Sequence, residues 1–588
     1  MRPARIVHRL PRLAAVVLAA AACDGAAPAP AAPPAAPPPV VPQPAGPRFT
    51  DVSEGAGLAG HVLHAGAAER KNWVLETVGG GAACLDFDGD GDQDVLLLGG
   101  ADMDEAGDVV VPEGCRTRLF ENLGGLRFRD VTARAGIDET GYTLGCAAAD
   151  FDGDGHVDVA VAGYDVLHLW RNRGDGTFEE VAAARGVVQP QWSCSASVSW
   201  GDLDGDGRLD LFVCRYVDQR ERIELIRRSG RGPRQCMWRG MTTYCGPAGL
   251  TPQPNLLFFQ RADGRFEQRE GWCDAVPGPS LQALVADLDG DGDLDVYVAN
   301  DGKDNELLVN DGTGRLANQA VRAGAAGNDN FLPQGSMGID AADLDADGRP
   351  ELAVANFVGE YNALYRNRTG AADRPLFEEL GVAAAFSVPR QERVSWAVVL
   401  ADFDGDARLD AYVTAGHVYP GESVPGSPPV RGEETPLLLR GLGGLRPGFA
   451  DASAAAGPHF ADARQWRTAC AADFDDDGDT DLLVIAQQSA PALLRNDGGE
   501  TRGFVGFDLR GAAPLTMPAG AVVEVTLADG RVLRRTLLLG SGYAGSQDPR
   551  LLFGLDGSAT VRARVLWPGG RETDLGDVAR NRVHVVRR

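Results

Sequence analysis

Seven copies of one nine-residue acidic pattern constrain this chain more than any other feature. The first copy, residues 86–94, reads Asp-Phe-Asp-Gly-Asp-Gly-Asp-Gln-Asp, and the others span 150–158, 202–210, 287–295, 343–351, 402–410 and 473–481. We call them acidic turns one to seven. Each has a carboxylate at positions 1, 3, 5 and 9 and a large apolar residue at position 2, and six have Gly at position 6. Four carboxylates this close repel one another unless a cation neutralises them.

The spacing of the carboxylates favours Ca²⁺, which takes roughly six to eight oxygen ligands from side chains, backbone carbonyls and water. Positions 1, 3 and 5, with a backbone carbonyl at 7, match the front half of an EF-hand loop, and Gly at 6 permits the sharp turn. Mg²⁺ fits less well because it keeps its waters. Short apolar, β-branched runs follow the turns, so we expect strand–turn–strand units. The sequence predicts up to seven Ca²⁺ ions; for a single copy, a solvated acidic turn is the alternative.

The predicted ligands come from positions 1, 3, 5, 7 and 9 of each turn. They are Asp86, Asp88, Asp90, Asp92 and Asp94; Asp150, Asp152, Asp154, His156 and Asp158; Asp202, Asp204, Asp206, Arg208 and Asp210; Asp287, Asp289, Asp291, Asp293 and Asp295; Asp343, Asp345, Asp347, Arg349 and Glu351; Asp402, Asp404, Asp406, Arg408 and Asp410; and Asp473, Asp475, Asp477, Asp479 and Asp481.

Two further recurring segments complete the repeat. One begins with Phe, as in Phe128-Arg129-Asp130-Val131, and the other is an apolar strand running into a hairpin turn, as in residues 169–176. About four short strands per unit, repeated seven times, predict an all-β fold with a seven-bladed β-propeller over residues 48–500. The last unit lacks its Phe segment, whereas the chain begins with an orphan copy at 49–52. We therefore expect residues 49–52 to supply the outer strand of the last blade and close the ring. After residue 502 the acidic pattern stops, and hairpin-like runs predict a small all-β domain over 503–588.

The N-terminus is typical of an exported protein. Residues 1–23 combine four arginines, a short apolar run and Ala-Ala-Ala-Cys, which predicts a signal peptide with a lipidated Cys23. A soluble secreted form is the alternative, because the lipobox-like run has Ala where Leu is usual. Residues 24–47 are almost all Ala and Pro and predict an extended tether. The expected location is a bacterial cell envelope or the outside of the cell, with membrane contact only through the lipid.

Charge and cysteines add further expectations. The net charge of -27 argues against nucleic acid and anionic lipid as partners. Export permits disulfides, and the best pair is Cys236 with Cys245, in an Arg-rich insertion at 215–250. That insertion is either a partner-binding arm or, as we favour, a segment that lies on its own propeller. Cys84, Cys146 and Cys470 are expected to be buried thiols on inner strands.

These motifs resemble a known family. The seven acidic turns are similar to FG-GAP/VCBS repeats, which build integrin-α-like propellers with calcium in the blade turns. The segments 540–543 (Gly-Ser-Gly-Tyr), 547–550 (Gln-Asp-Pro-Arg) and 567–570 (Trp-Pro-Gly-Gly) resemble the ASPIC/UnbV domain. The combination resembles the family that includes cartilage acidic protein and bacterial homologues, some of them associated with enediyne biosynthesis. The resemblance implies an exported calcium-binding protein but no settled activity. Ala407 and Glu351 depart from the pattern, and turn six is the weakest predicted metal site, because Ala in a left-handed conformation costs about 1 kcal/mol.

No catalytic constellation is recognisable in the sequence. His417, in Gly-His-Val-Tyr-Pro, is the one residue worth testing; it either serves a site or caps its own turn. We expect a calcium-stabilised, monomeric scaffold or binding protein of the cell envelope or surface, with a protein or glycan ligand. The alternative is an envelope enzyme or an accessory factor of a biosynthetic pathway, with its site on a propeller face.

Overall fold

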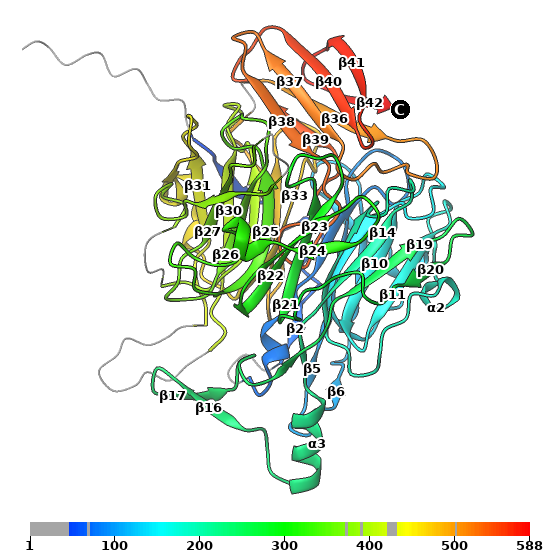
Figure 1. The fold of residues 1–588 in the computed structure, drawn as a ribbon, viewed down its shortest axis with the longest axis vertical. Helices are drawn as coiled ribbons and strands as arrows, with labels where there is room; N and C mark the ends of the chain where they lie inside the picture. The colour runs from blue at the N-terminus through cyan, green and yellow to red at the C-terminus, as the bar shows by residue number, and fades with distance from the viewer. Residues whose placement is uncertain (1–45, 67–70, 371–373, 388–391, 420–431, 500–501) are drawn as a thin grey trace, which may run out of the picture. The chain divides into compact units, whose positions relative to one another are not determined.

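Seven four-stranded antiparallel sheets make up most of the computed structural model, which describes residues 46–588 apart from 67–70, 371–373, 388–391, 420–431 and 500–501 (Figure 1). In each sheet, the strand before an acidic turn pairs with the strand after it, and two further strands follow outward. The predicted all-β fold class is therefore confirmed. The signal peptide, Cys23 and residues 24–45 of the predicted tether lie outside the described residues.

Each of the seven sheets is built from four strands, named in order from the innermost outward. Sheet one contains β3 (Ala82–Leu85), β4 (Asp94–Leu97), β7 (Arg118–Asn122) and β8 (Phe128–Asp130); sheet two β9 (Tyr142–Ala149), β10 (Asp158–Tyr164), β11 (Leu167–Asn172) and β12 (Phe178–Glu180); sheet three β13 (Ser195–Gly201), β14 (Asp210–Arg215), β19 (Leu256–Gln260) and β20 (Phe266–Gln268); sheet four β21 (Ser280–Ala286), β22 (Asp295–Lys303), β23 (Glu306–Asn310) and β24 (Leu316–Asn318). Sheet five contains β25 (Gln334–Ala342), β26 (Glu351–Asn356), β27 (Ala363–Asn367) and β28 (Phe377–Glu379); sheet six β29 (Ser395–Ala401), β30 (Asp410–Ala415), β31 (Leu437–Gly441) and β32 (Phe449–Asp451); sheet seven β33 (Trp466–Ala472), β34 (Asp481–Ala486), β35 (Ala492–Asn496) and β1 (Phe49–Asp51).

The innermost strands contact one another in chain order. β3 contacts β9, β9 contacts β13, and the series continues through β21, β25 and β29 to β33, which contacts β3 again. β1 pairs antiparallel with β35, with Phe49 opposite Asn496, so the first described strand completes the sheet of the last acidic turn. This pairing confirms the prediction for residues 49–52. β22 also pairs with β25, which joins sheets four and five along one edge.

Neighbouring sheets pack through the two apolar positions that recur in the sequence. The Phe that opens an outer strand contacts the position-2 residue of the preceding sheet's acidic turn. The ring centres are 5.7 Å apart for Phe128 and Phe474, 6.4 Å for Phe178 and Phe87, 5.9 Å for Phe266 and Phe151, and 5.5 Å for Phe49 and Phe403. The four turns that have Phe at position 2 are therefore anchored by burial of an aromatic ring.

A second link between neighbouring sheets comes from the amide that ends each third strand. Its side-chain nitrogen donates to the position-2 carbonyl of the preceding sheet. The bonds are Asn122 to Phe474 (2.9 Å), Asn172 to Phe87 (2.7 Å), Gln260 to Phe151 (2.8 Å), Asn310 to Leu203 (2.8 Å), Asn367 to Leu288 (2.9 Å) and Asn496 to Phe403 (2.9 Å). Gly441 holds the equivalent place in sheet six and has no side chain to donate. The sequence around these amides predicts only a turn, so this link between sheets is a finding of the structure.

Short elements connect the sheets. The one-turn helices α1 (Thr132–Ala135), α2 (Ala182–Arg185), α4 (Ala320–Ala323) and α5 (Ser453–Ala456) follow outer strands, and the remaining connections contain η1 (Val74–Thr77), η2 (Pro458–Ala461), β2 (His64–Ala65), β5 (Gly100–Met103) and β6 (Val109–Val110). The insertion contains β15 (Val217–Asp218), α3 (Arg220–Ser229), β16 (Gln235–Trp238), β17 (Met241–Tyr244) and β18 (Thr251–Pro252).

The insertion lies on its own propeller, as favoured from the sequence. Ile223 and Ile226 of α3 are buried. The Arg222 guanidinium carbon lies 4.9 Å from the centre of the Trp73 ring, and Arg227 pairs with Asp108. α3 and the β16–β17 hairpin sit on the side of the propeller away from the C-terminal strands (Figure 1).

The C-terminal region, residues 504–588, forms two further sheets. One contains β39 (Leu551–Gly554), β36 (Phe504–Arg510) and β42 (Val583–Arg587), and the other β38 (Val532–Thr536), β37 (Val522–Leu527), β40 (Val561–Trp567) and β41 (Arg571–Asp577). β38 ends at Thr536, where the chain turns into the propeller.

Residues 539–547, which we call the plug, enter the centre of the ring of inner strands. The plug forms backbone bonds with the inner strands of sheets three, five and one, from Trp200 N to Leu539 O (2.9 Å), Ile339 N to Gly542 O (2.7 Å) and Cys84 N to Ser546 O (3.0 Å). It also bonds to sheets two, four and seven through Cys146, Gln282 and Thr468. Tyr543 packs against Trp396 of sheet six at 5.1 Å, so the plug contacts the inner strand of every sheet. Gly338 permits this approach, because a Cβ there would lie 2.2 Å from Trp396 O and 2.6 Å from Gly542 O.

Candidate metal centres

The position-9 carboxylate ties each acidic turn to two strands. One of its oxygens accepts the N–H of position 2, and the other accepts an N–H from the third strand. In turn one, Asp94 accepts from Phe87 at 3.0 Å and from Asn122 at 2.7 Å, and in turn four Asp295 accepts from Leu288 and Asn310, both at 2.9 Å. The other five turns repeat the pattern. Position 9 therefore has a structural task that its sequence pattern alone did not reveal.

The backbone bends sharply at two positions of the turn, and both adopt left-handed conformations. Position 6 was predicted to do so, and its one non-glycine residue, Ala407, has φ 64°. Position 4 does the same: Ala346 and Asp476 have φ 58° where other copies have Gly. The bend turns the N–H of position 6 toward position 1, as from Gly91 to Asp86 at 3.2 Å and from Ala407 to Asp402 at 2.8 Å.

Carboxylate oxygens from positions 1, 3 and 5 converge in the turns. In turns one, three, four and five, one oxygen from each of these three positions lies within 4.8 Å of the others, and in turn two the group is formed by Asp150, Asp152 and Asp158. The carbonyl ligand proposed for position 7 stays a prediction. The position-7 side chains of Arg208, Arg349 and Arg408 fold back onto the position-5 carboxylates.

Four position-3 carboxylates each bury an oxygen that has no hydrogen-bond partner among the described residues. These oxygens are Oδ1 of Asp152, Asp204, Asp345 and Asp475. A buried acceptor without a partner is destabilising, and an ionised one more so. The same atom of the same motif position is left open four times, and oxygen is the ligand that hard divalent cations take. These residues therefore fit a Ca²⁺ ion.

Arginines bind Oδ2, which we call the outward oxygen, of several of these carboxylates. They leave the buried Oδ1, the inward oxygen, open. Arg171 Nε lies 2.6 Å from Asp152 Oδ2, and Arg269 Nη2 lies 2.8 Å from Asp204 Oδ2. Arg366 binds Asp345 Oδ2 in the same way. Such pairs orient the carboxylate without filling its Oδ1. In turns one and four, no Lys or Arg of the described chain forms an ion pair with positions 1, 3 or 5.

Burial shifts these carboxylates toward the protonated form. It raises the pKa of Asp94 to about 8 and that of Glu351 to about 9, with neighbouring carboxylates of the same turn adding to the effect. The pKa of Asp289 rises to about 6 for the same two reasons. A bound cation would reverse this preference, because it favours the ionised form.

Turn six differs from the others in how its charge is neutralised. Both oxygens of the fully buried Asp404 are occupied: Arg440 Nε lies 3.1 Å from Oδ2, and Arg502 Nη1 lies 3.3 Å from Oδ1. Asp406 is paired with Arg408 and Arg440. Asp404 thus has no open inward oxygen, and the guanidinium of Arg502 occupies the oxygen that stays open in turns two, three, five and seven.

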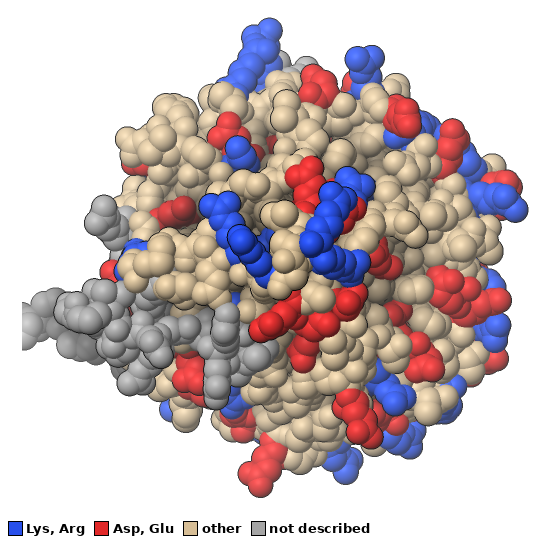
Figure 2. Space-filling view, turned by 90° about the horizontal axis from the view of Figure 1, so that it is seen from below, with Lys and Arg blue, Asp and Glu red and all other residues tan. Residues whose placement is uncertain are grey.

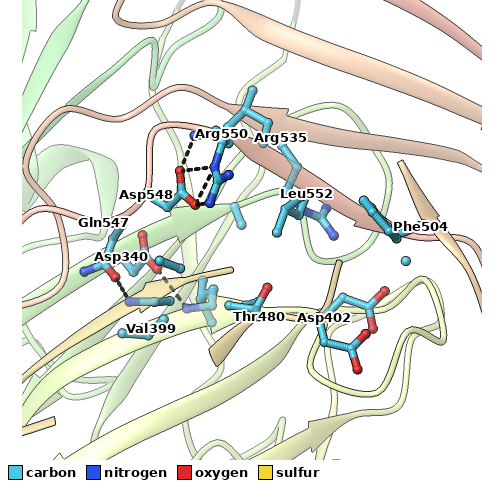
Figure 3. Close-up of a pocket in the computed structure, with 18 of the residues that line it drawn as sticks. Asp340, Val399, Asp402, Thr480, Phe504, Arg535, Gln547, Asp548, Arg550 and Leu552 are labelled. Atoms are coloured by element: carbon cyan, nitrogen blue, oxygen red, sulfur yellow. Dashed lines mark hydrogen bonds and ion pairs between the residues drawn. The ribbon is translucent and has the colours of Figure 1, made fainter. Parts of the chain in front are cut away.

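The C-terminal region covers turn six. Asp556 N donates to Gly405 O at 3.0 Å, and a Cβ on Gly554 would lie 2.1 Å from Asp402 Oδ2. Between them is a cavity of about 130 Å³ lined by Asp402, Asp340 and Arg535 (Figure 3). Figure 3 shows Arg535 and Arg550 reaching in from the C-terminal strands, with Arg550 held by Asp548. The Nη2 atom of Arg535 is buried without a partner among the described residues.

The remaining predicted site residues fall elsewhere. Cys236 and Cys245 are joined by a disulfide across β16 and β17. Cys84, Cys146 and Cys470 are buried thiols on inner strands. His417 Nδ1 accepts the N–H of Tyr419 at 3.0 Å, which is the turn-capping alternative. Burial lowers the pKa of His417 to about 4, so its ring is neutral.

The fold and these turns define a repeat protein of the β-propeller class, with an acidic turn in every sheet and a C-terminal region inserted into its channel. The family model for the FG-GAP-like repeat matches residues 86–161, 150–213, 287–354 and 343–413, which contain turns one to six. The model for ASPIC and UnbV matches residues 511–588. Cartilage acidic protein 1 of Xenopus tropicalis is 25% identical over 517 residues, covering 84% of this chain and 70% of its own length. The human protein of that name is 24% identical over 509 residues, covering 84% and 69%. The chain is therefore an FG-GAP-repeat protein with an ASPIC and UnbV domain, homologous to cartilage acidic protein 1.

Several solved structures are more distantly similar. The Dos1 propeller is 8% identical, covers 71% of this chain and 93% of its own, and has a TM-score of 0.36. An Agrocybe aegerita lectin described as recognising non-reducing terminal N-acetylglucosamine is 15% identical, covers 64% and 80%, and has a TM-score of 0.34. Among the described residues, no helix has both the length and the apolar character needed to cross a bilayer.

Proposed function

We propose that this protein is an exported, calcium-stabilised binding or scaffold protein whose seven sheets form a closed seven-bladed ring. The closed ring is supported by the cyclic contacts of the inner strands, by the pairing of β1 with β35, and by the hydrogen bonds that side-chain amides donate between sheets. The N-terminal sequence predicts a cell-envelope or surface location. That location is consistent with a protein or glycan as the ligand. We propose a non-enzymatic role.

The observation that carries the calcium proposal is the repeated open Oδ1 of position 3. Positions 1, 3 and 5 would hold the ion in turns one, three, four, five and seven, and positions 1, 3 and 9 would hold it in turn two. A bound Ca²⁺ would supply the positive charge that neutralises the clustered carboxylates of the turn. The protein's own contribution is to fix the carboxylates. Position 9 bonds to two strands, the apolar side chain of position 2 packs in or against the core, and in turns two, three and five arginines hold the outward oxygen of position 3. Turn six would hold no ion because Arg502 fills its open oxygen.

The role of the metal would be to join the ring to the C-terminal region. Acidic turns one, two, five, six and seven all contact that region. Arg550 reaches Gly91 O and Asp476, Arg534 approaches Asp343, and Thr516 bonds to Asp150. Calcium that stiffens these turns would therefore also stabilise the surface on which the C-terminal region rests.

Calcium titration of the metal-stripped protein tests this proposal. We expect about six ions per chain by isothermal calorimetry and by elemental analysis after gel filtration. The full chain should also melt at a higher temperature in calcium than in EGTA. An identical melt in both, with no calcium retained, would refute the proposal. Turnover of a broad ester, glycoside and phosphate substrate set would refute the non-enzymatic role.

A further inference from the structure

A cavity of about 750 Å³ lies on the side of the propeller that carries the insertion, away from the C-terminal strands. The β16–β17 hairpin forms one wall, and the ends of strands in sheets four and five, with Trp396 of sheet six, form the others. Tyr543 of the plug packs against Trp396, so the plug lies behind this wall. The volume is within the usual range of small-molecule sites.

Aromatic rings dominate the wall between the insertion and sheet six. Trp238 of the hairpin lies 5.0 Å from Tyr419, measured between ring centres, and Tyr244 also lies 5.0 Å from Tyr419. Phe357 of sheet five lies 6.3 Å from Tyr419 in an edge-on arrangement. Trp238, Phe357 and Tyr419 are only partly buried, so each keeps some surface for a ligand. These rings come from three distant parts of the chain, which the folded insertion brings together.

Two carboxylates, Asp301 and Glu360, also line the cavity. Asp301 accepts the Tyr216 hydroxyl at 2.6 Å through Oδ2, and in the described chain its Oδ1 accepts no hydrogen bond. Glu360 accepts the Gly335 N–H at 2.8 Å. Each side chain is thus fixed by one neighbour while lining the cavity. Burial raises the pKa of Asp301 to about 6 and that of Glu360 to about 7.

The charges around the cavity are balanced. Lys303 lies in the lining, the Arg239 guanidinium carbon lies 4.7 Å from the Trp238 ring centre, and that of Arg467 lies 4.2 Å from the Trp396 ring centre. These cations offset the two carboxylates, so neither sign of charge dominates the cavity. Figure 2, which views this side, shows basic and acidic side chains both present on the surface. The balance favours a neutral ligand over a phosphate, a uronic acid or an organic cation.

We propose that this cavity binds a neutral saccharide, an inference that rests on the proposed binding function and names its ligand class. Sugar rings present an apolar C–H face that packs on aromatic rings and hydroxyl groups that donate to fixed carboxylates. The cavity offers both surfaces: Trp238, Phe357 and Tyr419 as platforms, and Asp301 and Glu360 as acceptors. Because the hairpin supplies Trp238, the insertion determines which ligand this propeller binds.

The test is titration of the calcium-loaded full chain with tetra-N-acetylchitotetraose, cellotetraose and mannotriose, monitored by tryptophan fluorescence and calorimetry. We expect at least one of these neutral probes to bind. Phe357→Ala and Asp301→Asn should each weaken that binding at least tenfold. Phe331→Ala is the matched control, because Phe331 is 78% exposed and lies outside the cavity. It should leave the affinity unchanged.

The outcomes separate this inference from the calcium proposal. If the melt depends on calcium but none of the three probes binds, the saccharide site is refuted while the calcium-stabilised propeller stands. Binding of tetramethylammonium or a tetragalacturonate in place of the neutral probes would refute the charge argument. Equal weakening by Phe331→Ala and Phe357→Ala would place the ligand elsewhere. If Phe357→Ala fails to fold, loss of its calcium-dependent melt shows this, and Asp301→Asn then decides the question.

Discussion

The side-chain amide of Asn122 donates a 2.9 Å hydrogen bond to the main-chain carbonyl of Phe474, 352 residues later in the chain. It joins the first sheet to the last and repeats the bond that links five other pairs of neighbouring sheets. Both partners are buried, so neither has water as an alternative. The first and last sheets are thus linked by the same contact that links five other pairs of neighbouring sheets.

Asn122→Ala is expected to lower the free energy of unfolding by about 1–3 kcal/mol, because it leaves the Phe474 carbonyl buried without a donor. Urea denaturation in calcium measures the change. Asn330→Ala is the control, since Asn330 is exposed and, among the described residues, bonds only to Asp329 and its own loop. This variant should change stability by less than about 0.5 kcal/mol. Equal effects of the two variants would contradict a specific role for the amide.

Removal of calcium is expected to lower the melting temperature of the full chain. Each site filled at a free calcium concentration one hundred times its Kd would add about 2.7 kcal/mol, provided the unfolded chain binds none. Differential scanning calorimetry in calcium and in EGTA gives the difference. Magnesium at the same concentration should restore less of it, because Mg²⁺ keeps its waters. Full restoration by magnesium would count against the assignment.

Turns four and six are expected to respond differently to the same substitution. Asp289→Asn removes the negative charge of a position-3 ligand where no arginine substitutes for the cation, and the weakened site should lose its ion during gel filtration, so the calcium count should fall by about one. Asp404→Asn changes the same position in turn six, where Arg440 and Arg502 already occupy both oxygens, and the count should not change. Elemental analysis of the two variants beside the wild type measures this. A loss of one ion in Asp404→Asn would show that turn six binds metal.

Gly338→Ala is expected to destabilise the protein by about 1–3 kcal/mol, because its Cβ would meet the backbone of both Trp396 and the plug. Hydrogen exchange should rise in the plug before it rises in the outer strands. Gly448→Ala serves as the control, since a Cβ there meets nothing within 4 Å and its φ is not positive. Unchanged exchange at residues 539–547 in Gly338→Ala would contradict the close approach.

The pH dependence of stability should include a contribution from Asp340. Burial raises its pKa to about 7, against about 3.9 in an unfolded chain, so the folded state binds the proton more tightly. Stability is then lost as pH rises from about 4 to 7, and the loss stays constant above that. From pH 5 to pH 8 the wild type should lose up to about 3 kcal/mol relative to Asp340→Asn. Calcium-saturated melts across this range measure it, with the exposed Asp138→Asn as control; parallel curves for all three proteins would contradict the shift.

The acidic turns, the strand pattern and the pairing of the first strand with the last sheet were predictable because they depend on local chemistry repeated along the chain. Carboxylates at fixed spacing indicate a cation turn, and the orphan Phe segment at 49–52 indicates a missing partner strand. Ala407 also adopts the left-handed conformation that its place in the motif requires. The role of position 9 was harder to predict, because a carboxylate there can be either a metal ligand or a hydrogen-bond acceptor.

Sequence by itself therefore determined the repeat, its strands and the residues that gather in each turn, since these follow from neighbours within about ten positions. Only the tertiary structure decided which charges meet across the chain. Arg502 fills turn six, the plug enters the channel, and Trp238 lies beside Tyr419, all through contacts between distant segments. Such contacts depend on how whole sheets pack, and the spacing of residues along one chain contains no record of that packing.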